Sequence, residues 1–237
     1  MKKTLFISIL SFGLGTAASA ATVFTSQEEY SLGSGPSINN SALSGLIESP
    51  SSNTSPGTGT IMMWVTLDSL PSSLSSLISV ETKKSNGGHS VSLNGWGVMV
   101  GTDGRLQICQ QTVNASNSVT SASSKGTTSA SIGAGEAFHI AISTAGGRNS
   151  GNFTLYINGE EVLTASGFGL NGNAFSELIL GSSGLSGTVS GLTVDDVVLD
   201  AGSIKSILEQ TRPVPEPATV SLGLVGLAAL MMRRRRS

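Results

Sequence analysis

Residues 137–164, AFHIAISTAGGRNSGNFTLYINGEEVLT, contain the pattern that most restricts the fold of this chain. Apolar side chains alternate with polar or small ones in AFHIAIS and again in NFTLYI, which is the two-residue period of a strand with one face in a core. Asn158-Gly159 follows, a dipeptide that favours the positive φ angles of a two-residue hairpin turn, and a return strand begins at Glu160. The sequence therefore predicts two linked β-hairpins at the centre of the domain.

The composition favours strands and turns over helices. The chain has 30 glycines and only 12% charged residues, and glycine in a helix interior costs about 1 kcal/mol relative to alanine. Further short apolar segments recur at the spacing of about 8–12 residues that is typical of an all-β sandwich. A short helix capped by Ser203 is expected after the last of them, while residues 114–135 show no clear period. We expect strands at residues 21–25, 41–48, 59–67, 77–82, 90–93, 96–100, 105–110, 177–181 and 193–199.

The N-terminal segment has the order of parts found in secretory signal peptides. Lys2 and Lys3 precede an apolar run at residues 5–14, and Ala18-Ser19-Ala20 provides a small-residue cleavage site. The apolar run is too short to span a membrane as a helix. We therefore expect residues 1–20 to be removed and the mature chain to be exported.

An apolar stretch and a basic cluster follow one another at the other end. Residues 218–232 are uncharged and mostly apolar, and a helix of that length rises about 22 Å, short of the ~30 Å hydrocarbon core. The arginines after it stay on the cytoplasmic side and leave the domain outside. The sequence thus predicts a hydrophobic C-terminal helix that is a marginal transmembrane span.

Together with the preceding Pro-Glu-Pro triplet, this tail resembles the PEP-CTERM sorting signal of Gram-negative bacteria. The triplet, the apolar helix and the terminal Arg cluster stand in the order of that signal. The resemblance implies recognition by an exosortase, cleavage near the triplet, and delivery to the cell envelope or an extracellular matrix. The residues that match the signal are Pro215, Glu216, Pro217, Arg233, Arg234, Arg235 and Arg236.

Charge and cysteine content limit the function of the part between the terminal segments. Residues 21–211 contain six basic and fourteen acidic side chains, a local balance of −8, so this part repels phosphate polymers and no binding to nucleic acid is expected. Cys109 has no second cysteine with which to form a disulfide and is interpreted as a small packed thiol. We interpret residues 21–211 as one domain, 212–217 as a Pro-rich spacer, and 218–237 as the hydrophobic helix and Arg cluster.

The order of motifs along residues 59–209 resembles a known family. GTIMMWVTL, AFHIAIS, LYINGEEV, ELILG, GLTVDDVVL and the closing helix AGSIKSILE are similar to the laminin-G-like domains of the concanavalin A-like lectin/glucanase superfamily. Phe138-His139 is followed here by Ile-Ala-Ile, a close variant of the Val-Ala-Val strand of the family, and no Trp stands at the aromatic position. The resemblance implies a jelly roll of two antiparallel sheets. Members bind sugars, mediate adhesion or assist enzymes, so the fold alone does not select a function.

Catalysis is not expected from the carboxylates of this chain. A retaining glycosidase needs two carboxyl groups about 5 Å apart, and the Glu-x-Asp-x-x-Glu spacing of the glucanases in the superfamily is absent. Asp195 and Asp196 are adjacent, so on a strand they point to opposite faces and cannot form a catalytic pair. The Asp-Asp pair matches one that laminin-G-like domains commonly have, and two readings remain open for it: bracing of a loop, or a share in a calcium site.

Sugar binding usually requires an exposed aromatic ring. Trp96, within Asn94-Gly95-Trp96-Gly97, is the candidate ligand contact together with Asn94, because flanking glycines indicate a bulge or a rim position. The alternative is that Trp96 packs in the core. Trp64 is expected in the core, and Tyr156 on the surface of the other sheet face.

The sequence thus predicts a non-catalytic, exported envelope protein with a lectin-like module for binding, adhesion or matrix structure. The alternative is a glycoside hydrolase or its accessory carbohydrate-binding domain. Expected partners are the exosortase-type sorting machinery, the membrane through the C-terminal helix, and glycans or matrix polysaccharide. No cofactor is expected, with calcium at Asp195 and Asp196 as the one alternative.

Overall fold

A computed structural model of the protein describes residues 22–38, 59–81, 93–113, 119–145, 151–168 and 177–212. These segments are mostly strands, as the composition predicted. The elements are β1 (Thr22–Thr25), β2 (Tyr30–Ser31), the 3-10 helix η1 (Leu32–Ser34), β3 (Ser37–Ile38), β4 (Gly59–Ser69), β5 (Ser75–Glu81), β6 (Leu93–Val100), β7 (Arg105–Val113), β8 (Val119–Ser131), β9 (Ala137–Ala145), β10 (Gly151–Ile157), β11 (Glu160–Phe168), β12 (Glu177–Leu180), β13 (Ser186–Asp195) and the helix α2 (Ala201–Thr211).

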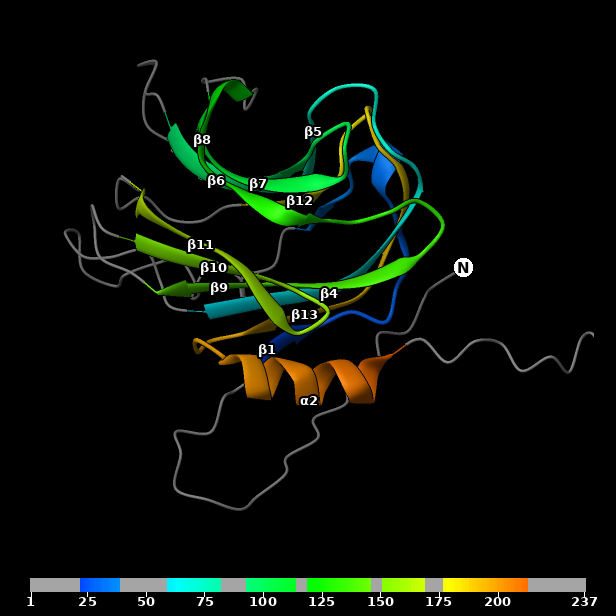
Figure 1. Cartoon of the computed structure of the whole chain (residues 1–237), viewed down its shortest axis with the longest axis vertical. Helices are drawn as coiled ribbons and strands as arrows, with labels where there is room; N and C mark the ends of the chain where they lie inside the picture. Colours follow the sequence, from blue (N-terminus) through cyan, green and yellow to red (C-terminus); the bar gives the residue numbers. More distant parts are fainter. Residues whose placement is uncertain are drawn as a thin grey trace, which may run out of the picture.

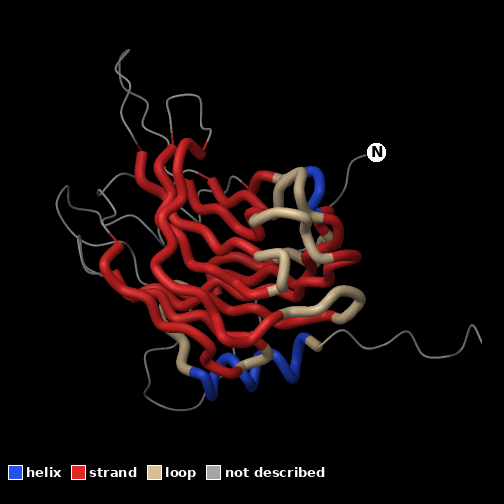
Figure 2. The backbone as a smooth tube through the Cα atoms, turned by 45° about the horizontal axis from the view of Figure 1, so that its top comes forward, coloured by secondary structure: helices blue, strands red, loops and turns tan. Residues whose placement is uncertain are grey.

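The strands form two antiparallel sheets packed face to face (Figure 1). Sheet A has the order β1-β13-β4-β9-β10-β11, with β2 also paired to β13, and sheet B has the order β3-β12-β5-β6-β7-β8. Helix α2 lies along the outer face of sheet A, as Figure 2 shows from a second direction. This is the all-β jelly roll of two antiparallel sheets that the sequence predicted.

The two central hairpins form as expected. Strands β9, β10 and β11 are neighbours in sheet A, and the turn between β10 and β11 has φ angles of 51° at Asn158 and 77° at Gly159. Both angles are positive, as the two-residue turn requires. The return strand is longer than expected, since β11 continues to Phe168.

Strand β4 lies in the middle of sheet A, between β13 and β9. Its residues 59–65 are all buried. Ile61 and Met63 belong to the main core, whereas Met62 belongs to a second cluster beneath helix α2. The near-continuous apolar run of this strand is therefore explained by cover on both faces.

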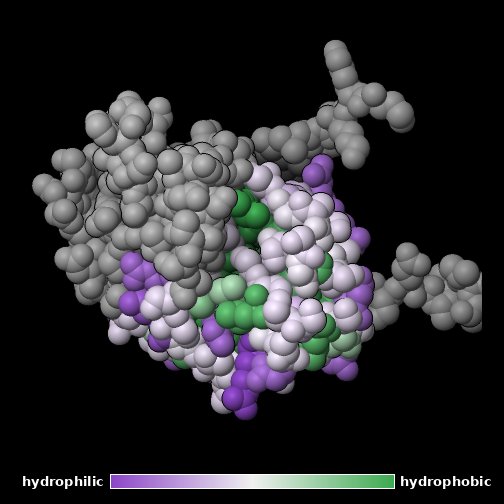
Figure 3. Space-filling view, turned by 90° about the horizontal axis from the view of Figure 1, so that it is seen from above, coloured by the Kyte–Doolittle hydropathy of each residue, from purple (hydrophilic) through white to green (hydrophobic). Residues whose placement is uncertain are grey.

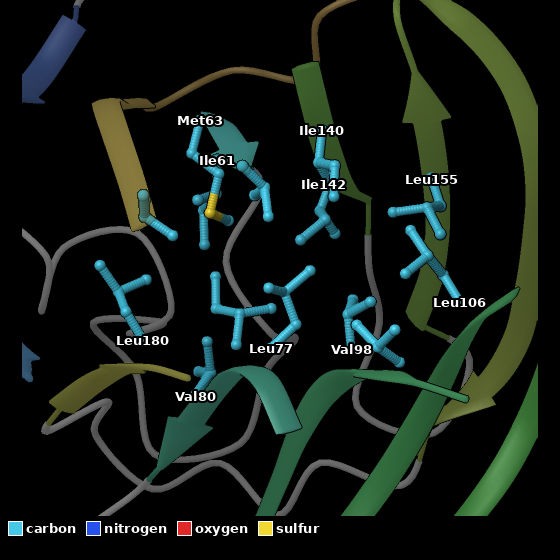
Figure 4. Close-up of a cluster of buried hydrophobic side chains, with 14 of the residues drawn as sticks. Ile61, Met63, Leu77, Val80, Val98, Leu106, Ile140, Ile142, Leu155 and Leu180 are labelled. Carbon is cyan, nitrogen blue, oxygen red and sulfur yellow. The ribbon is translucent and has the colours of Figure 1, made fainter. Parts of the chain in front are cut away.

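Inward-facing residues of both sheets form one core between the layers, shown in Figure 4. The alternation of each strand supplies it, because every second side chain points toward the opposite sheet. The labelled members from sheet A are Ile61, Met63, Ile140, Ile142 and Leu155, and those from sheet B are Leu77, Val80, Val98, Leu106 and Leu180.

Helix α2 begins one turn earlier than the sequence indicated. The N-cap is Asp200, whose carboxylate accepts a hydrogen bond of 2.7 Å from the backbone N–H of Ser203. The expectation of Ser203 as the cap is wrong, because Ser203 is the third helical residue and donates to the cap. Ile204 is the buried residue of the helix, and it packs with Met62 and Tyr156.

The loop between β13 and α2 is held against sheet A by buried hydroxyl groups. Thr60 Oγ1 donates to the carbonyl of Val197 at 2.8 Å and accepts from the N–H of Leu199 at 2.9 Å, while Ser143 Oγ donates to the carbonyl of Leu199 at 3.1 Å. These bonds satisfy the backbone of a buried connection. They determine where helix α2 starts on the sheet.

One strand was not expected from the sequence, and several expected segments cannot be compared with the structure. Residues 114–135, which showed no clear period, contribute the 13-residue strand β8 at the edge of sheet B. The expected signal peptide (1–20), the strand at 41–48 and the tail after residue 212 lie outside the described residues. Among the helices of the described segments, none has the length and apolar character needed to span a membrane.

Candidate functional site

Trp96 lies in the core and not at a rim. Its side chain is 1% exposed, and its ring packs against Phe153 with centroids 4.9 Å apart. The prediction of a ligand contact at Trp96 is therefore wrong, and the alternative of core packing holds. The flanking Gly95 and Gly97 occupy the opposite face by alternation, so they leave that face bare and do not expose the ring. Asn94 lies in β6 opposite Thr112, and its side chain is outside what the structure describes.

Asp195 and Asp196 do not act together. Asp195 is 2% exposed, and its Oδ1 accepts a hydrogen bond of 2.7 Å from Thr22 Oγ1, whereas Asp196 is exposed. Burial raises the pKa of the Asp195 carboxyl, the bond from Thr22 lowers it, and the charge of Asp196 raises it. Calcium requires six to eight oxygen ligands. In the described segments, no three His, Cys, Asp or Glu side chains gather at a metal-binding spacing, and calcium at Asp195 and Asp196 stays a prediction.

The outer face of sheet B presents a row of mostly small residues across six strands. Cross-strand register places Ser37 opposite Ile179 and Ile179 opposite Ser79. It continues from Ser79 to Gly97, from Gly97 to Cys109, and from Cys109 to Ser124 in the edge strand β8. Ile179, Ser79 and Gly97 lie between core residues of their strands, so these positions face outward, and cross-strand pairing carries the row on to Cys109 and Ser124. We call this set the small-residue row: Ser37, Ile179, Ser79, Gly97, Cys109 and Ser124.

A second, larger row borders the first. Met99 pairs with Ser76 on one side and with Gln107 on the other, and Gln107 pairs with Thr127. Figure 3 looks down on this side of the molecule and shows apolar surface bordered by pale, weakly polar surface. The described tryptophans and tyrosines lie elsewhere. The described positions of this face therefore offer hydroxyl and amide groups and the Met99 side chain, and no indole or phenol ring.

Cys109 is one of three buried members of the small-residue row, with Ser79 and Gly97. It is 1% exposed, and burial raises the pKa of its thiol. A thiol that stays protonated is a poor nucleophile. The interpretation of Cys109 as a packed thiol is consistent with this position.

Strand register also pairs two glutamate positions that the sequence separates widely. Glu177 lies opposite Glu81 where β12 meets β5, and both positions alternate with core residues, so they belong to the outer face of sheet B. Directly opposed residues of an antiparallel pair have Cβ atoms about 4.5–5.5 Å apart. No sequence spacing reveals this pair.

Helix α2 packs on the outer face of sheet A and occupies the surface that a ligand would need above β4 and β9. Trp64 and His139 meet there with ring centroids 5.3 Å apart and an interplanar angle of 67°. Trp64 Nε1 donates to Thr211 Oγ1 at 3.3 Å, in the last turn of the helix. Trp64 and Tyr156 are both buried, and Tyr156 lies beneath the helix. The expectation of a surface tyrosine was wrong, because the sequence did not show which residues α2 covers.

His139 is the most perturbed titratable group of the described residues. It is 2% exposed, its Nδ1 has no hydrogen-bond partner, and burial lowers its pKa from 6.5 to about 4. The imidazole is therefore neutral at pH 7, and its burial keeps it away from solvent. It is a packing residue between sheet A and helix α2.

Comparison with known proteins agrees with this architecture. The family model of the concanavalin A-like lectin/glucanases superfamily, Laminin_G_3, matches residues 40–204. The chain belongs to this superfamily. No curated protein matches the chain.

Solved structures similar to this superfamily member share the fold at low sequence identity. A carbohydrate-binding module, the Ruminococcus gnavus IT-sialidase CBM40 bound to alpha2,3 sialyllactose, is 14% identical over 79% of this chain and 99% of its own, with a TM-score of 0.53. Trypanosoma rangeli sialidase is 16% identical over 65% of this chain, with a TM-score of 0.45, and the match spans 23% of the sialidase. The SAP-like pentraxin of Limulus polyphemus is 18% identical over 65% of this chain and 71% of its own, with a TM-score of 0.46.

Proposed function

We propose that the protein is a non-catalytic carbohydrate-binding module of the cell surface, and that the outer face of sheet B holds the glycan. The observation behind this proposal is the small-residue row together with Met99 and Gln107. On this face Ser37, Ser124 and Thr127 are exposed and Met99 and Gln107 are half-buried, whereas Ser79, Gly97 and Cys109 are buried. The hydroxyl and amide groups of the accessible positions can pair with sugar hydroxyls. Membership of a lectin-like superfamily and the neighbouring carbohydrate-binding module support the same class of ligand.

A glycan array probed with the chain from residue 21 onward tests this face. Gln107→Ala is expected to weaken binding by about fivefold, since one hydrogen bond contributes about 1 kcal/mol and 1.4 kcal/mol is tenfold. Gln210→Ala is the matched control, because Gln210 is an exposed residue of helix α2 on the opposite side of the molecule. Equal loss in both variants, or no loss in Gln107→Ala, would place the glycan elsewhere.

One observation favours a second candidate, a glycoside hydrolase. The register pair Glu81 and Glu177 brings two glutamate positions side by side in sheet B, and a retaining glycosidase requires two neighbouring carboxyl groups. Product analysis of the glycans that bind decides between the two. Released sugar that disappears in both Glu81→Gln and Glu177→Gln establishes hydrolysis, and intact glycan in all three proteins supports the binding module.

Export and sorting complete the proposed function. The signal-peptide pattern at residues 1–20 and the Pro215 to Arg236 tail support export followed by exosortase sorting to the envelope or matrix of a Gram-negative bacterium. Arg212, the last described residue, follows helix α2 on the sheet A side.

Deletion of residues 215–237 is expected to release the domain into the medium, because it removes both the apolar helix and the arginines that hold it in the membrane. Cell fractionation followed by immunoblotting measures this. The control is replacement of Gln210 by alanine, which leaves the tail complete. An equal envelope-bound fraction in the deleted and intact chains would show that the tail is not the anchor.

A further inference from the structure

Tyr156 has a hydroxyl group without a hydrogen-bond partner in the described part of the chain. The side chain is 6% exposed, and its ring packs beneath helix α2 with Met62 and Ile204. No hydrogen bond of the described segments involves its hydroxyl oxygen, and that oxygen is not one of their enclosed unpartnered atoms. A tyrosine buried to this degree usually has a partner for its O–H group. The hydroxyl is therefore available to a ligand.

Two carboxylates lie beside this hydroxyl. Glu161 of β11 is directly opposite Tyr156 of β10, and the Cβ atoms of such a pair are about 4.5–5.5 Å apart. The second carboxylate belongs to Asp200, the N-cap of α2. Burial raises the pKa of the Tyr156 hydroxyl, and the charges of Glu161 and Asp200 raise it further, so both carboxylates are close enough to act on it. Both acidic side chains are exposed to solvent.

The helix leaves this end of sheet A accessible. Strand β11 is the edge strand of the sheet, and its Glu161 and Thr164 are exposed, while Thr154 of β10 is half-buried. Alternation and pairing place these three side chains on the same face as Tyr156. We call the resulting surface the carboxylate site: Thr154, Tyr156, Glu161, Thr164 and Asp200.

The hydrogen bonds within the carboxylate site leave mostly acceptors free. Thr164 Oγ1 donates to Glu161 Oε1 at 3.0 Å. A hydroxyl has one hydrogen, so the 3.3 Å bond between the hydroxyls of Thr154 and Thr164 uses the hydrogen of Thr154. A ligand therefore meets the lone pairs of the carboxylates and of Thr154, and Tyr156 is the side chain that can donate to it.

The cations of the described segments are not paired with these carboxylates. Lys205 of helix α2 pairs with Glu160, and Arg105 pairs with Asp103. Two carboxylates without a cation form their strongest hydrogen bonds with a positively charged donor. A primary ammonium group has the charge and three N–H donors, so it complements this site better than a neutral hydroxyl does.

We propose that the carboxylate site binds the free amine of an amino sugar. The ammonium lies between Glu161 and Asp200, while a neighbouring hydroxyl of the sugar donates to Thr154 and accepts from Tyr156. An N-acetylated sugar has the hydroxyls without the charge, and a simple diamine has the charge without the hydroxyls. The site is on sheet A, so it is separate from the glycan face proposed on sheet B and does not depend on that face.

Isothermal titration calorimetry of the full chain in detergent solution tests this site with a glucosamine tetramer. The free-amine tetramer is expected to bind about tenfold more tightly than its N-acetylated form, because charge-assisted hydrogen bonds are about twice as strong as neutral ones. Glu161→Gln is expected to weaken binding of the free-amine tetramer about thirtyfold, and Tyr156→Phe about fivefold. Glu136→Gln is the matched control, because Glu136 is an exposed glutamate before the far end of β9.

Tyr156→Phe keeps the ring beneath the helix and removes a hydroxyl that has no partner in the described segments. Its free energy of unfolding is therefore expected to equal that of the native chain, so weaker binding by this variant does not come from unfolding. A binding loss in Tyr156→Phe that is matched by a loss of stability would contradict the role of the hydroxyl.

Several outcomes would overturn the amine site. They are no binding of the free-amine tetramer, equal affinity for the acetylated tetramer, or an equal loss in Glu136→Gln and Glu161→Gln. Putrescine that binds as tightly as the tetramer, or calcium that displaces it, would show a general cation site instead. An affinity for the free-amine tetramer that falls in Gln107→Ala and not in Glu161→Gln would place the ammonium on sheet B.

Discussion

Replacement of Trp96 by alanine is expected to lower the free energy of unfolding by about 4 kcal/mol. The indole is 1% exposed, packs against Phe153 and lies between the two sheets, and truncation of a buried aromatic side chain typically costs about 3–5 kcal/mol through lost contacts and the cavity that remains. Urea denaturation followed by circular dichroism measures the change.

Trp96→Phe is the matched comparison for this prediction. It keeps a ring against Phe153, so the loss of stability is expected to be less than half of that in Trp96→Ala. Glycan binding by the folded Trp96→Phe protein is expected to equal that of the native chain. A stability change below about 1 kcal/mol in Trp96→Ala, together with lost binding, would return Trp96 to the surface as a ligand contact.

Acid is expected to destabilise the protein through His139. Burial lowers the pKa of this imidazole to about 4 in the folded state, against about 6.5 in the unfolded chain. Between these values the unfolded chain binds more protons than the folded one, so stability rises with pH across that window. The contribution is complete above about pH 6.5 and is lost as the pH falls to about 4, a change of about 3 kcal/mol.

His139→Phe isolates this effect. Phenylalanine keeps the edge contact with Trp64 and removes the titrating group together with its unpartnered Nδ1. The raised pKa of Asp195 acts in the opposite direction, and it is common to both proteins, so the difference between their stabilities reports His139 alone. Urea midpoints at several values between about pH 4 and pH 7 measure that difference. Parallel pH dependence in the two proteins would contradict the assignment.

Local patterns were sufficient where one strand and its turn form a unit. The alternation in β9 and β10 predicted which side chains enter the core, and Asn158-Gly159 predicted a turn whose two φ angles are positive. The same reasoning was insufficient for Trp96. Its flanking glycines were interpreted as space around the ring, whereas register places Gly97 in the small-residue row on the opposite face.

Contacts between distant segments were beyond local patterns. Glu81 and Glu177 become neighbours only when β5 pairs with β12, and Thr22 reaches Asp195 only when the first strand pairs with the last. Strand β8 was missed because its Ser- and Thr-rich sequence alternates weakly, and its place beside β7 comes from sheet pairing.

The sequence by itself determined the period of each strand, the geometry of the tight turn and the composition of the core, because these depend on side chains only a few residues apart. Only the tertiary structure decided which faces are covered and which glutamate positions pair. Helix α2 shields Trp64, Tyr156 and His139 on the outer face of sheet A. Burial and strand register are properties of the assembled sheets, and they bring distant residues together and perturb the pKa values.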